Sequence, residues 1–246
     1  MMEQVIFKIK SNEPIARSVY RMVLEGDTSA ISASGQFVNL LIEGFFLRRP
    51  ISVCDSVPGE LTLVYKVVGK GTEAMSRMGE GEEVDILTGL GNGYDLTLSG
   101  DRPLLVGGGV GVPPLYRLCR ELIAQGKSVS VILGFNTKDE VFYKDEFEAL
   151  GAKVYVSTVD GSMGKKGFVT DCLEGLDYTY FYTCGPEPML KALYRATATS
   201  GQFSFEERMG CGFGACMGCS CKTVTGYKRI CKEGPVLCKE DIIWEK

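Results

Sequence analysis

The sequence predicts an α/β plus β chain in three parts: an N-terminal antiparallel β-barrel, a parallel-sheet α/β domain, and a small C-terminal domain rich in cysteine. Short β-type runs fill the first hundred residues, and strand and helix patterns alternate over the second hundred. Six of the ten cysteines lie between Cys211 and Cys238. A length of 246 residues also exceeds that of one ordinary compact domain. We therefore predict domains at residues 1–100, 101–200 and 201–246.

The first part has the pattern of a small barrel. Its β-type runs are short and separated by turn residues, a spacing typical of sandwiches and small barrels. A short helical stretch at 72–78 follows Gly69-Lys70-Gly71, and the turn-rich segment 99–103 ends the set. The predicted strands cover residues 5–9, 19–24, 37–42, 61–68 and 84–87.

The second part alternates strand and helix patterns. This alternation indicates βαβ units and a parallel sheet with helices on both faces. Sheets of this kind bind nucleotides at the carboxyl ends of their strands. The predicted strands cover 104–106, 129–133, 154–157 and 178–182, the predicted helices cover 113–124, 144–150, 169–174 and 186–199, and a short strand at 202–207 leads into the cysteine-rich tail.

Composition excludes several kinds of function. Apolar residues make up 45% of the chain and charged residues 24%, as in ordinary globular proteins. A formal net charge of -4 argues against a nucleic-acid surface. The chain has no histidine, so hydrolysis by Ser-His-Asp or Cys-His is not available. We see neither a signal peptide nor an apolar run long enough to span a membrane, and we expect a cytoplasmic protein.

The cysteine spacing predicts a metal cluster. In a reducing compartment, clustered cysteines indicate metal or redox chemistry more than disulfides. Cys211, Cys216 and Cys219 have the spacing Cys-x4-Cys-x2-Cys, with Cys231 downstream, which is the spacing of plant-type [2Fe-2S] ferredoxins. Structural zinc sites use four thiolates too, but usually in two Cys-x2-Cys pairs. We therefore predict these four as cluster ligands; Cys221 is close enough to Cys219 to leave a swapped ligand open.

Two segments of the barrel suit a flavin. Arg49-Pro50-Ile51-Ser52 offers an arginine and a hydroxyl for a flavin and its phosphate, although a surface ion pair is the alternative for Arg49. Gly71-Thr72 opens the short helix, where backbone N–H groups attract a pyrophosphate. The two segments together favour FAD over FMN.

Two glycine turns in the second part suit a nicotinamide nucleotide. The run from Leu104 to Leu115 is a strand, a glycine-rich turn and a helix start, although Val112 breaks the strict Gly-x-Gly-x-x-Gly pattern. A second strand-to-helix turn is suited to a place beside a nicotinamide ring. The predicted nucleotide-binding residues are Gly107, Gly108, Gly109, Gly111, Cys184, Gly185 and Pro186.

The order of these motifs resembles the ferredoxin-NADP reductase superfamily. More closely, it resembles the electron transfer subunits of the NAD-dependent (class 1B) dihydroorotate dehydrogenases. The resemblance covers essentially the whole chain and is most specific at residues 207–219 and 230–236. It implies the same four cluster ligands, and it implies that FAD is bound by Arg49, Pro50, Ile51, Ser52, Val64, Tyr65, Lys66, Gly71 and Thr72.

The resemblance also implies an activity in pyrimidine biosynthesis. An FMN-containing catalytic subunit would oxidise dihydroorotate, and the electrons would cross the [2Fe-2S] cluster and FAD to NAD+. The catalytic base would belong to that partner, so we expect no catalytic residue on this chain. The resemblance further implies a heterotetramer with two copies of each chain.

Two alternatives stay open on sequence alone. The nearest is an electron transfer subunit of a cytoplasmic hydrogenase or of a ferredoxin:NADP oxidoreductase complex, which would hold the same cofactors. The other is a zinc-stabilised binding module without a redox role. The sequence also leaves open the choice between NADH and NADPH, because it shows neither a clear acid for a ribose nor a basic cluster for a 2′-phosphate.

Overall fold

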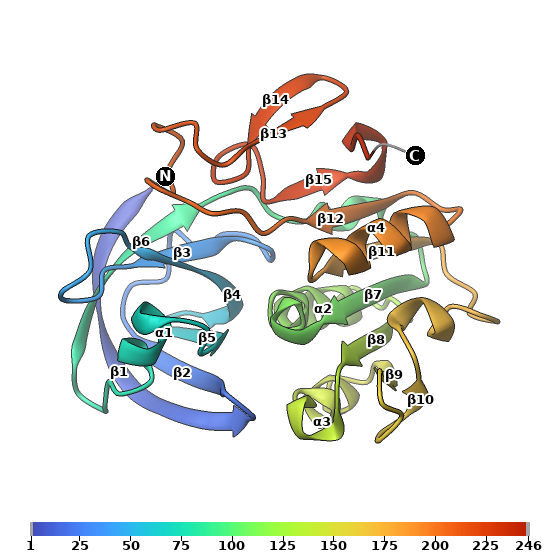
Figure 1. Ribbon diagram of the computed structural model, residues 1–246, viewed down its shortest axis with the longest axis horizontal. Coiled ribbons are helices and arrows are strands. Elements are labelled where there is room, and N and C mark those ends of the chain that lie inside the picture. Colours follow the sequence, from blue (N-terminus) through green and yellow to red (C-terminus); the bar gives the residue numbers. More distant parts are fainter. Residues whose placement is uncertain (1, 245–246) are drawn as a thin grey trace.

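The computed structural model describes residues 2–244 and contains the three predicted parts (Figure 1). The barrel lies on one side, the nucleotide-type sheet lies on the other, and the C-terminal hairpin stands above both. The predicted fold class is confirmed.

Six antiparallel strands close the barrel in the order β1-β2-β5-β4-β3-β6. Alternate side chains such as Val38 and Leu40 point into its core, as the two-residue period of a strand requires. Strand β4 is not among the predicted strands, because Arg49-Pro50 at its start has the character of a loop. The strands are β1 (Glu3–Ala16), β2 (Val19–Glu25), β3 (Phe37–Leu40), β4 (Arg49–Val57), β5 (Glu60–Lys66) and β6 (Glu83–Leu90), and the short helix α1 (Lys70–Met75) follows β5.

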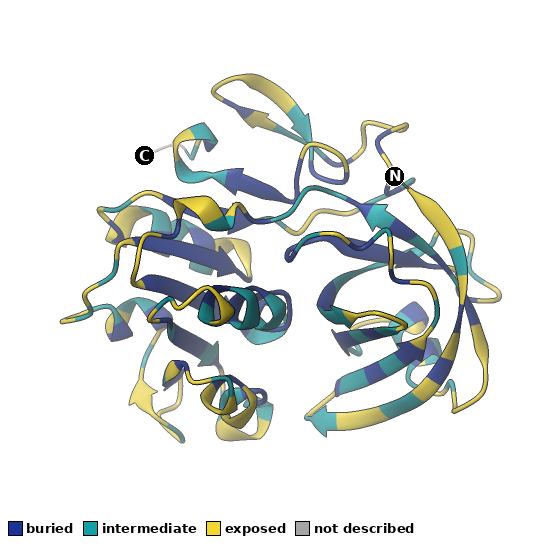
Figure 2. Ribbon diagram, turned by 180° about the vertical axis from the view of Figure 1, so that it is seen from behind, coloured by how far each residue is buried: buried dark blue, intermediate teal, exposed yellow. Residues whose placement is uncertain are grey.

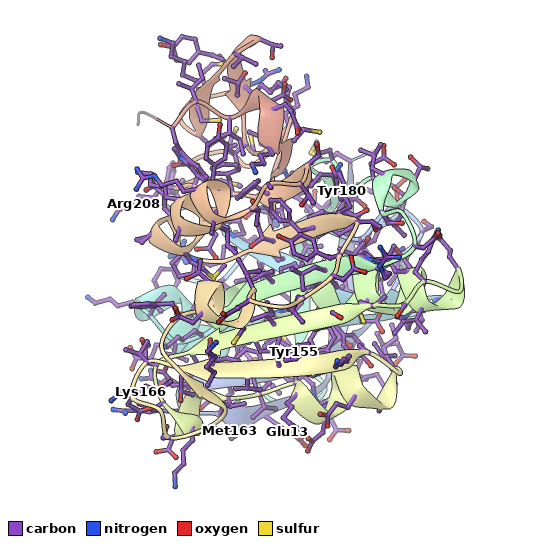
Figure 3. All side chains as sticks on the ribbon, turned by 90° about the vertical axis from the view of Figure 1, so that its right-hand side faces the viewer. Glu13, Tyr155, Met163, Lys166, Tyr180 and Arg208 are labelled. Carbon is purple, nitrogen blue, oxygen red and sulfur yellow. The ribbon has the colours of Figure 1, made fainter. Side chains whose placement is uncertain are left out.

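The second sheet has seven strands in the order β10-β9-β8-β7-β11-β12-β15. All its neighbours pair in parallel except β12 with β15. Its strands are β7 (Pro103–Gly108), β8 (Ser130–Phe135), β9 (Lys153–Thr158), β10 (Lys165–Lys166), β11 (Tyr180–Cys184), β12 (Gly201–Ser204) and β15 (Val236–Cys238). In Figure 3, Lys166 lies at the β10 edge, whereas Tyr180 on β11 lies toward the C-terminal part.

Helices cover both faces of this sheet, as predicted. Leu105 and Val131 pack with α2 (Pro114–Ala124) and α3 (Lys144–Ala149) in one core, while Leu104 and Ile132 pack with α4 (Glu187–Ala196) in another. The predicted helix at 169–174 is a single 3-10 turn, η4 (Val169–Cys172). Gly175, in the left-handed region at φ +75°, follows soon after it and favours the end of a helix there.

The C-terminal part is small and lies across the sheet and the barrel. Strands β13 (Ser220–Thr223) and β14 (Gly226–Arg229) form an exposed hairpin, seen with mostly teal and yellow residues in Figure 2. Two strands from beyond residue 200, β12 and β15, complete the nucleotide-type sheet. The domain boundary at residue 200 stays a prediction, and this sheet runs across it.

The barrel packs directly on α2. Arg120 of α2 lies 2.6 Å from the carboxylate of Asp55 on β4, and the buried Cys54 thiol donates to the Tyr143 hydroxyl at 3.3 Å. These contacts hold the two domains against each other. The end of β5 and the carboxyl ends of the parallel strands then lie at one cavity, which is described below. No helix within residues 2–244 has the length and apolar character needed to cross a membrane.

Candidate cofactor and nucleotide sites

The four predicted cluster ligands lie in two neighbouring segments. Cys211, Cys216 and Cys219 come from the segment between β12 and β13, and Cys231 follows β14. Cys219 and Cys231 are buried, Cys211 is half-buried and Cys216 is exposed. One side of the cysteine group therefore packs on the core and the other faces solvent.

Backbone N–H groups point at the sulfur atoms in this loop. Although burial opposes it, the N–H groups of Cys216, Phe213 and Ala215 lower the pKa of the Cys211 thiol to about 6. This favours the thiolate, which is the form that binds metal. The N–H···Sγ distances are 3.2 Å from Ala215 and 3.4 Å from Cys216 to Cys211, 3.5 Å from Gly218 to Cys216, and 3.4 Å from Cys231 to Cys219.

The cysteines fall into two adjacent pairs. The Cys211 thiol shares a hydrogen bond with Cys216, and burial followed by the neighbouring Cys219 thiol raises the pKa of Cys231 to about 12. Among the described residues, no three cysteine, histidine, aspartate or glutamate side chains are close enough together to hold a single metal ion. The spacing Cys-x4-Cys-x2-Cys with a distant fourth cysteine is that of a [2Fe-2S] site, whereas a structural zinc ion usually takes two Cys-x2-Cys pairs.

Two glycines let the loop fold tightly. Gly212 has φ +78° and Gly214 has φ +93°, conformations that residues with a side chain rarely adopt. A Cβ atom on Gly214 would also lie 2.6 Å from the Lys232 side chain. Arg229 of β14 donates to the Gly214 carbonyl at 2.6 Å, which fixes the loop against the hairpin.

The predicted flavin residues of β4 and α1 lie together. A Cβ on Gly71 would be only 1.9 Å from Nε of Arg49, so the guanidinium lies directly on this glycine. The same guanidinium lies 4.7 Å from the ring centroid of Phe45. Thr72 holds the turn at the start of α1, because its hydroxyl accepts from the N–H groups of Val68 and Gly69. A cation beside a glycine turn is the arrangement that a pyrophosphate group requires.

The other predicted flavin residues lie on β4 and β5. Ile51 packs against the barrel core, whereas Pro50 and Ser52 alternate with it on the outer face. The Val64 and Tyr65 side chains are buried, and the Tyr65 hydroxyl donates to Asn12 at 2.9 Å. These two residues therefore offer a ligand only their backbone, while Lys66 reaches the nucleotide cavity described next.

A cavity of about 560 Å³ lies at the carboxyl ends of the parallel strands. This is where sheets of this class bind nucleotides. Lys66 of the barrel reaches into it and lies 3.4 Å from Glu140. Although burial opposes it, the hydrogen bond from Asn136 and the charge of Lys66 hold the pKa of Glu140 below its usual value. Of the predicted nucleotide-binding residues, Gly108, Gly109, Gly111, Gly185 and Pro186 line the cavity.

The two glycine turns pack against each other. A Cβ on Gly111 would lie 2.2 Å from the carbonyl oxygen of Cys184, so the first turn contacts the second directly. Gly107 lies behind the turn against Val112, and the Cys184 thiol is buried, so neither residue lines the cavity. Burial raises the pKa of Cys184 to about 12.

Several cavity residues carry no signal in the sequence. Phe168 lines the cavity although it is 65% exposed, and Glu206, whose pKa is raised by burial, lines it as well. Each is a single residue outside any glycine or cysteine motif. Only the strand order, which brings the end of β12 beside that of β11, places Glu206 here.

Comparison with known proteins agrees with this geometry. Residues 206–243 match the family model described as the iron-sulfur cluster binding domain of dihydroorotate dehydrogenase B, and residues 105–195 match the oxidoreductase NAD-binding domain. A barrel, a nucleotide-binding sheet and an iron–sulfur domain on one chain define an NAD-linked flavoprotein oxidoreductase with the ferredoxin-NADP reductase fold.

Two full-length relatives identify the family. The dihydroorotate dehydrogenase B (NAD(+)) electron transfer subunit of Fusobacterium nucleatum is 45% identical, over 95% of this chain and 96% of its own. Its counterpart in Geobacillus sp. is 43% identical, over 99% of this chain and 100% of its own. The chain belongs to the family of dihydroorotate dehydrogenase B electron transfer subunits.

Solved structures show the same fold. The structure of an NADH-dependent reduced ferredoxin-NADP oxidoreductase that was studied for flavin-based electron bifurcation matches with a TM-score of 0.87 and 30% identity, over 97% of this chain and 90% of its own. A ferredoxin NADP+ reductase from Neisseria gonorrhoeae with bound FAD and NADP matches with a TM-score of 0.68 and 18% identity, over 79% and 89% of the two chains. The second likeness concerns the fold alone.

Proposed function

We propose that this chain carries electrons from a separate, FMN-containing catalytic subunit, which oxidises dihydroorotate, to NAD+. Cys211, Cys216, Cys219 and Cys231 would hold a [2Fe-2S] cluster. FAD would be bound by Arg49, Pro50, Ile51, Ser52, the backbone of Val64 and Tyr65, Lys66, Gly71 and Thr72. NAD would be bound by Gly107, Gly108, Gly109, Gly111, Cys184, Gly185 and Pro186, with Gly107 and Cys184 supporting the turns from behind.

The contacts among the three candidate sites carry this proposal. The Cys211 carbonyl is hydrogen-bonded to Asn39 of β3, and β3 pairs with the strand that begins at Arg49. Lys66, at the end of β5, lines the nucleotide cavity. One short region of protein therefore joins the cysteine loop, the flavin-type strands and the nucleotide cavity.

Each set of residues would have a separate role in binding. When bound, a flavin supplies the exchange between hydride transfer at a nicotinamide and single-electron transfer at an iron–sulfur cluster. Arg49 and the Gly71 turn would neutralise its pyrophosphate, and the N–H groups around Cys211 would stabilise cluster charge. The packed turns at Gly111 and Cys184 would hold the nucleotide at the strand ends.

For the nucleotide we propose NAD in preference to NADP. Among the described residues that line the cavity, Lys66 is the single lysine or arginine, and it is paired with Glu140. No basic cluster is therefore free to bind a 2′-phosphate there. The two full-length relatives are named for NAD(+) as well.

The exposed side of the cysteine loop supports a protein partner. Cys216 is exposed, and beside it Phe213 and Met217 expose 44% and 54% of their surface. We propose that the catalytic subunit binds this chain in a heterotetramer with two copies of each. We propose a cytoplasmic location because none of the ten cysteines, all within residues 2–244, forms a disulfide, as expected in a reducing compartment.

Reconstitution with the catalytic subunit tests the proposal. The chain is purified with its cofactors, and dihydroorotate-dependent NAD+ reduction is measured with the chain alone and with the FMN-type dihydroorotate dehydrogenase of the same genome. We expect NAD+ reduction only when both are present, and a preparation that contains flavin and iron. A matched control uses Cys238→Ser, a cysteine outside the proposed ligand set, which should stay active where Cys216→Ser does not.

An inactive pair with FAD and iron both loaded would contradict the proposed partner. It would favour an electron transfer subunit of a hydrogenase or ferredoxin complex. A colourless protein with one zinc ion would contradict the redox role itself.

A further inference from the structure

One asparagine of the barrel lies between the flavin-type strand and the cysteine loop. Asn39 is the third residue of β3 and pairs directly with Pro50 of β4. Its neighbours Val38 and Leu40 point into the barrel core, so Asn39 points outward, on the same face as Pro50. Phe37, also on that face, packs in the core that contains Cys219 and Cys231.

The Asn39 side chain contacts the first proposed ligand directly. Its Nδ2 donates to the carbonyl of Cys211 at 3.3 Å, across 172 positions of sequence. A Cβ on the next residue, Gly212, would lie 2.4 Å from the same nitrogen. Within residues 2–244, this is the sole hydrogen bond from the barrel strands to the segment that carries Cys211, Cys216 and Cys219.

The other end of the carboxamide is buried without a partner. Asn39 is only 1% exposed, and its Oδ1 makes no hydrogen bond within the described residues. A buried acceptor of this kind destabilises a fold unless something compensates for it. An apolar residue would fill this place at a lower cost, so the packing of the fold alone does not account for an asparagine here.

We propose that Asn39 is a positioning residue that fixes the Cys211 end of the cysteine loop against the flavin-binding strand. It thereby sets the separation between the proposed cluster and the proposed flavin. The inference rests on the function proposed above, since it takes Cys211 as a cluster ligand and β4 as a flavin strand. Asn39 lies outside every motif predicted from the sequence, and its role would be to position the groups between which electrons pass.

A second asparagine provides a matched control. Asn92, which follows β6, also ties the C-terminal part to the barrel domain, but through a different segment. Its Nδ2 donates to the Val236 carbonyl at 2.7 Å, and its Oδ1 accepts from the Val236 N–H at 3.0 Å. Asn92 therefore contacts the chain after Cys231 and not the loop of the first three ligands.

The test compares Asn39→Leu and Asn92→Leu in the full chain loaded with flavin and iron. Amide hydrogen exchange is measured by residue, and the dithionite-reduced cluster is examined by electron paramagnetic resonance. For Asn39→Leu we expect exchange at residues 212–216 to accelerate about three- to tenfold and the g values of the cluster to shift. For Asn92→Leu we expect faster exchange at 233–236 and unchanged g values.

Unchanged exchange at 212–216 and unchanged g values in Asn39→Leu would overturn the proposal, whatever happens to thermal stability. If Asn39→Leu yields no folded protein, Asn39→Ala decides, because it removes the donor to the Cys211 carbonyl without adding bulk. Its exchange at 212–216 should accelerate as well, and normal exchange would refute the inference. Neither readout needs the catalytic subunit, so failure of the reconstitution assay leaves this result intact.

Discussion

At the scale of single residues, the contact between Arg49 and Gly71 decides whether the flavin-type site can form. The guanidinium occupies the space where any other residue would place its Cβ, 1.9 Å from Nε. The atom that would be displaced belongs to the end of a flexible side chain and not to the backbone. A larger residue at position 71 should therefore move Arg49 without unfolding the barrel.

We expect Gly71→Ala to lower the affinity for FAD at least about tenfold, because it displaces the cation that a pyrophosphate needs. The midpoint of thermal unfolding of the apoprotein should change little. Flavin absorbance per chain after dialysis measures the effect. Gly79→Ala is the matched control, since Gly79 is exposed and its Cβ would meet only Glu82, at an ordinary 3.6 Å. Equal flavin retention in the two variants would contradict the assignment.

Three buried thiols predict how stability depends on alkaline pH. Burial raises the pKa of Cys54, Cys119 and Cys184 to about 12, from an ordinary value of 9.0. Between these values the native state holds protons that the unfolded state has lost. The free energy of unfolding should therefore fall as pH rises from 9 toward 12 and be unaffected by these groups below 9. Each thiol contributes up to about 1.4 kcal/mol per pH unit.

Urea unfolding at pH 8, 9 and 10 measures this slope. Cys119→Ala should make it less steep, because it removes one of the three buried thiols, and Cys119 does not line the nucleotide cavity. A slope identical to that of the unsubstituted chain would show that the Cys119 thiol does not titrate differently in the two states.

Single residues also show which sites a sequence pattern can indicate and which it cannot. The four cysteines could be chosen because their spacing is specific to one kind of cluster, and Gly71 because it opens a helix beside a lysine. Asn39 and Glu206 could not, because a lone polar residue on or after a strand has no pattern of its own. Their roles depend on contacts with residues far away in sequence, such as Cys211 for Asn39.

At the scale of elements, the nucleotide site depends on two strand-to-helix turns that pack against each other. A Cβ on Gly111 would overlap the backbone of Cys184 and Gly185, at 2.2 Å and 2.5 Å. Backbone cannot move aside as the Arg49 side chain can. Strands β7 and β11 are neighbours in the sheet, so separating their turns also disturbs the sheet edge that forms the cavity.

We expect Gly111→Ala to raise the KM for NADH at least about tenfold and to destabilise the fold by about 1–3 kcal/mol. Flavin and iron content should stay normal, because Arg49, Gly71 and the four proposed cysteine ligands are not part of this turn. Steady-state reduction of a dye by NADH, with flavin content as the internal reference, measures the change. An unaltered KM would indicate that the nucleotide binds elsewhere.

The elements that sequence predicted best are the central strands of the nucleotide-type sheet and the amphipathic helix beside them. Helix α2 and strands β7, β8 and β11 appear close to their expected bounds, since buried apolar runs alternate there with an amphipathic helix. Strand β4 was missed because it starts with Arg49-Pro50. Strands β10 and β15 contain two and three residues, too few to show a period. They are strands because they pair with β9 and β12, which their own sequence does not reveal.

At the scale of the whole molecule, the arrangement of the parts matters more than any one site. Asp55 and Arg120 hold the barrel to α2, and Asn39 and Asn92 hold the C-terminal part to the barrel domain. The sequence predicted three parts and their order but not these contacts, because packing between domains leaves no periodic pattern. The contacts bring a cysteine loop, a flavin-type strand and a nucleotide cavity into one continuous region.

We predict that this region forms one electron path within a single chain. Anaerobic titration of the purified chain with NADH, followed by flavin absorbance and by electron paramagnetic resonance of the cluster, tests it most directly. We predict that NADH bleaches the flavin and produces the signal of a reduced [2Fe-2S] cluster, with about three electrons taken up per chain and no other protein present. If NADH bleaches the flavin but only dithionite reduces the cluster, the flavin and the cluster do not belong to one electron path.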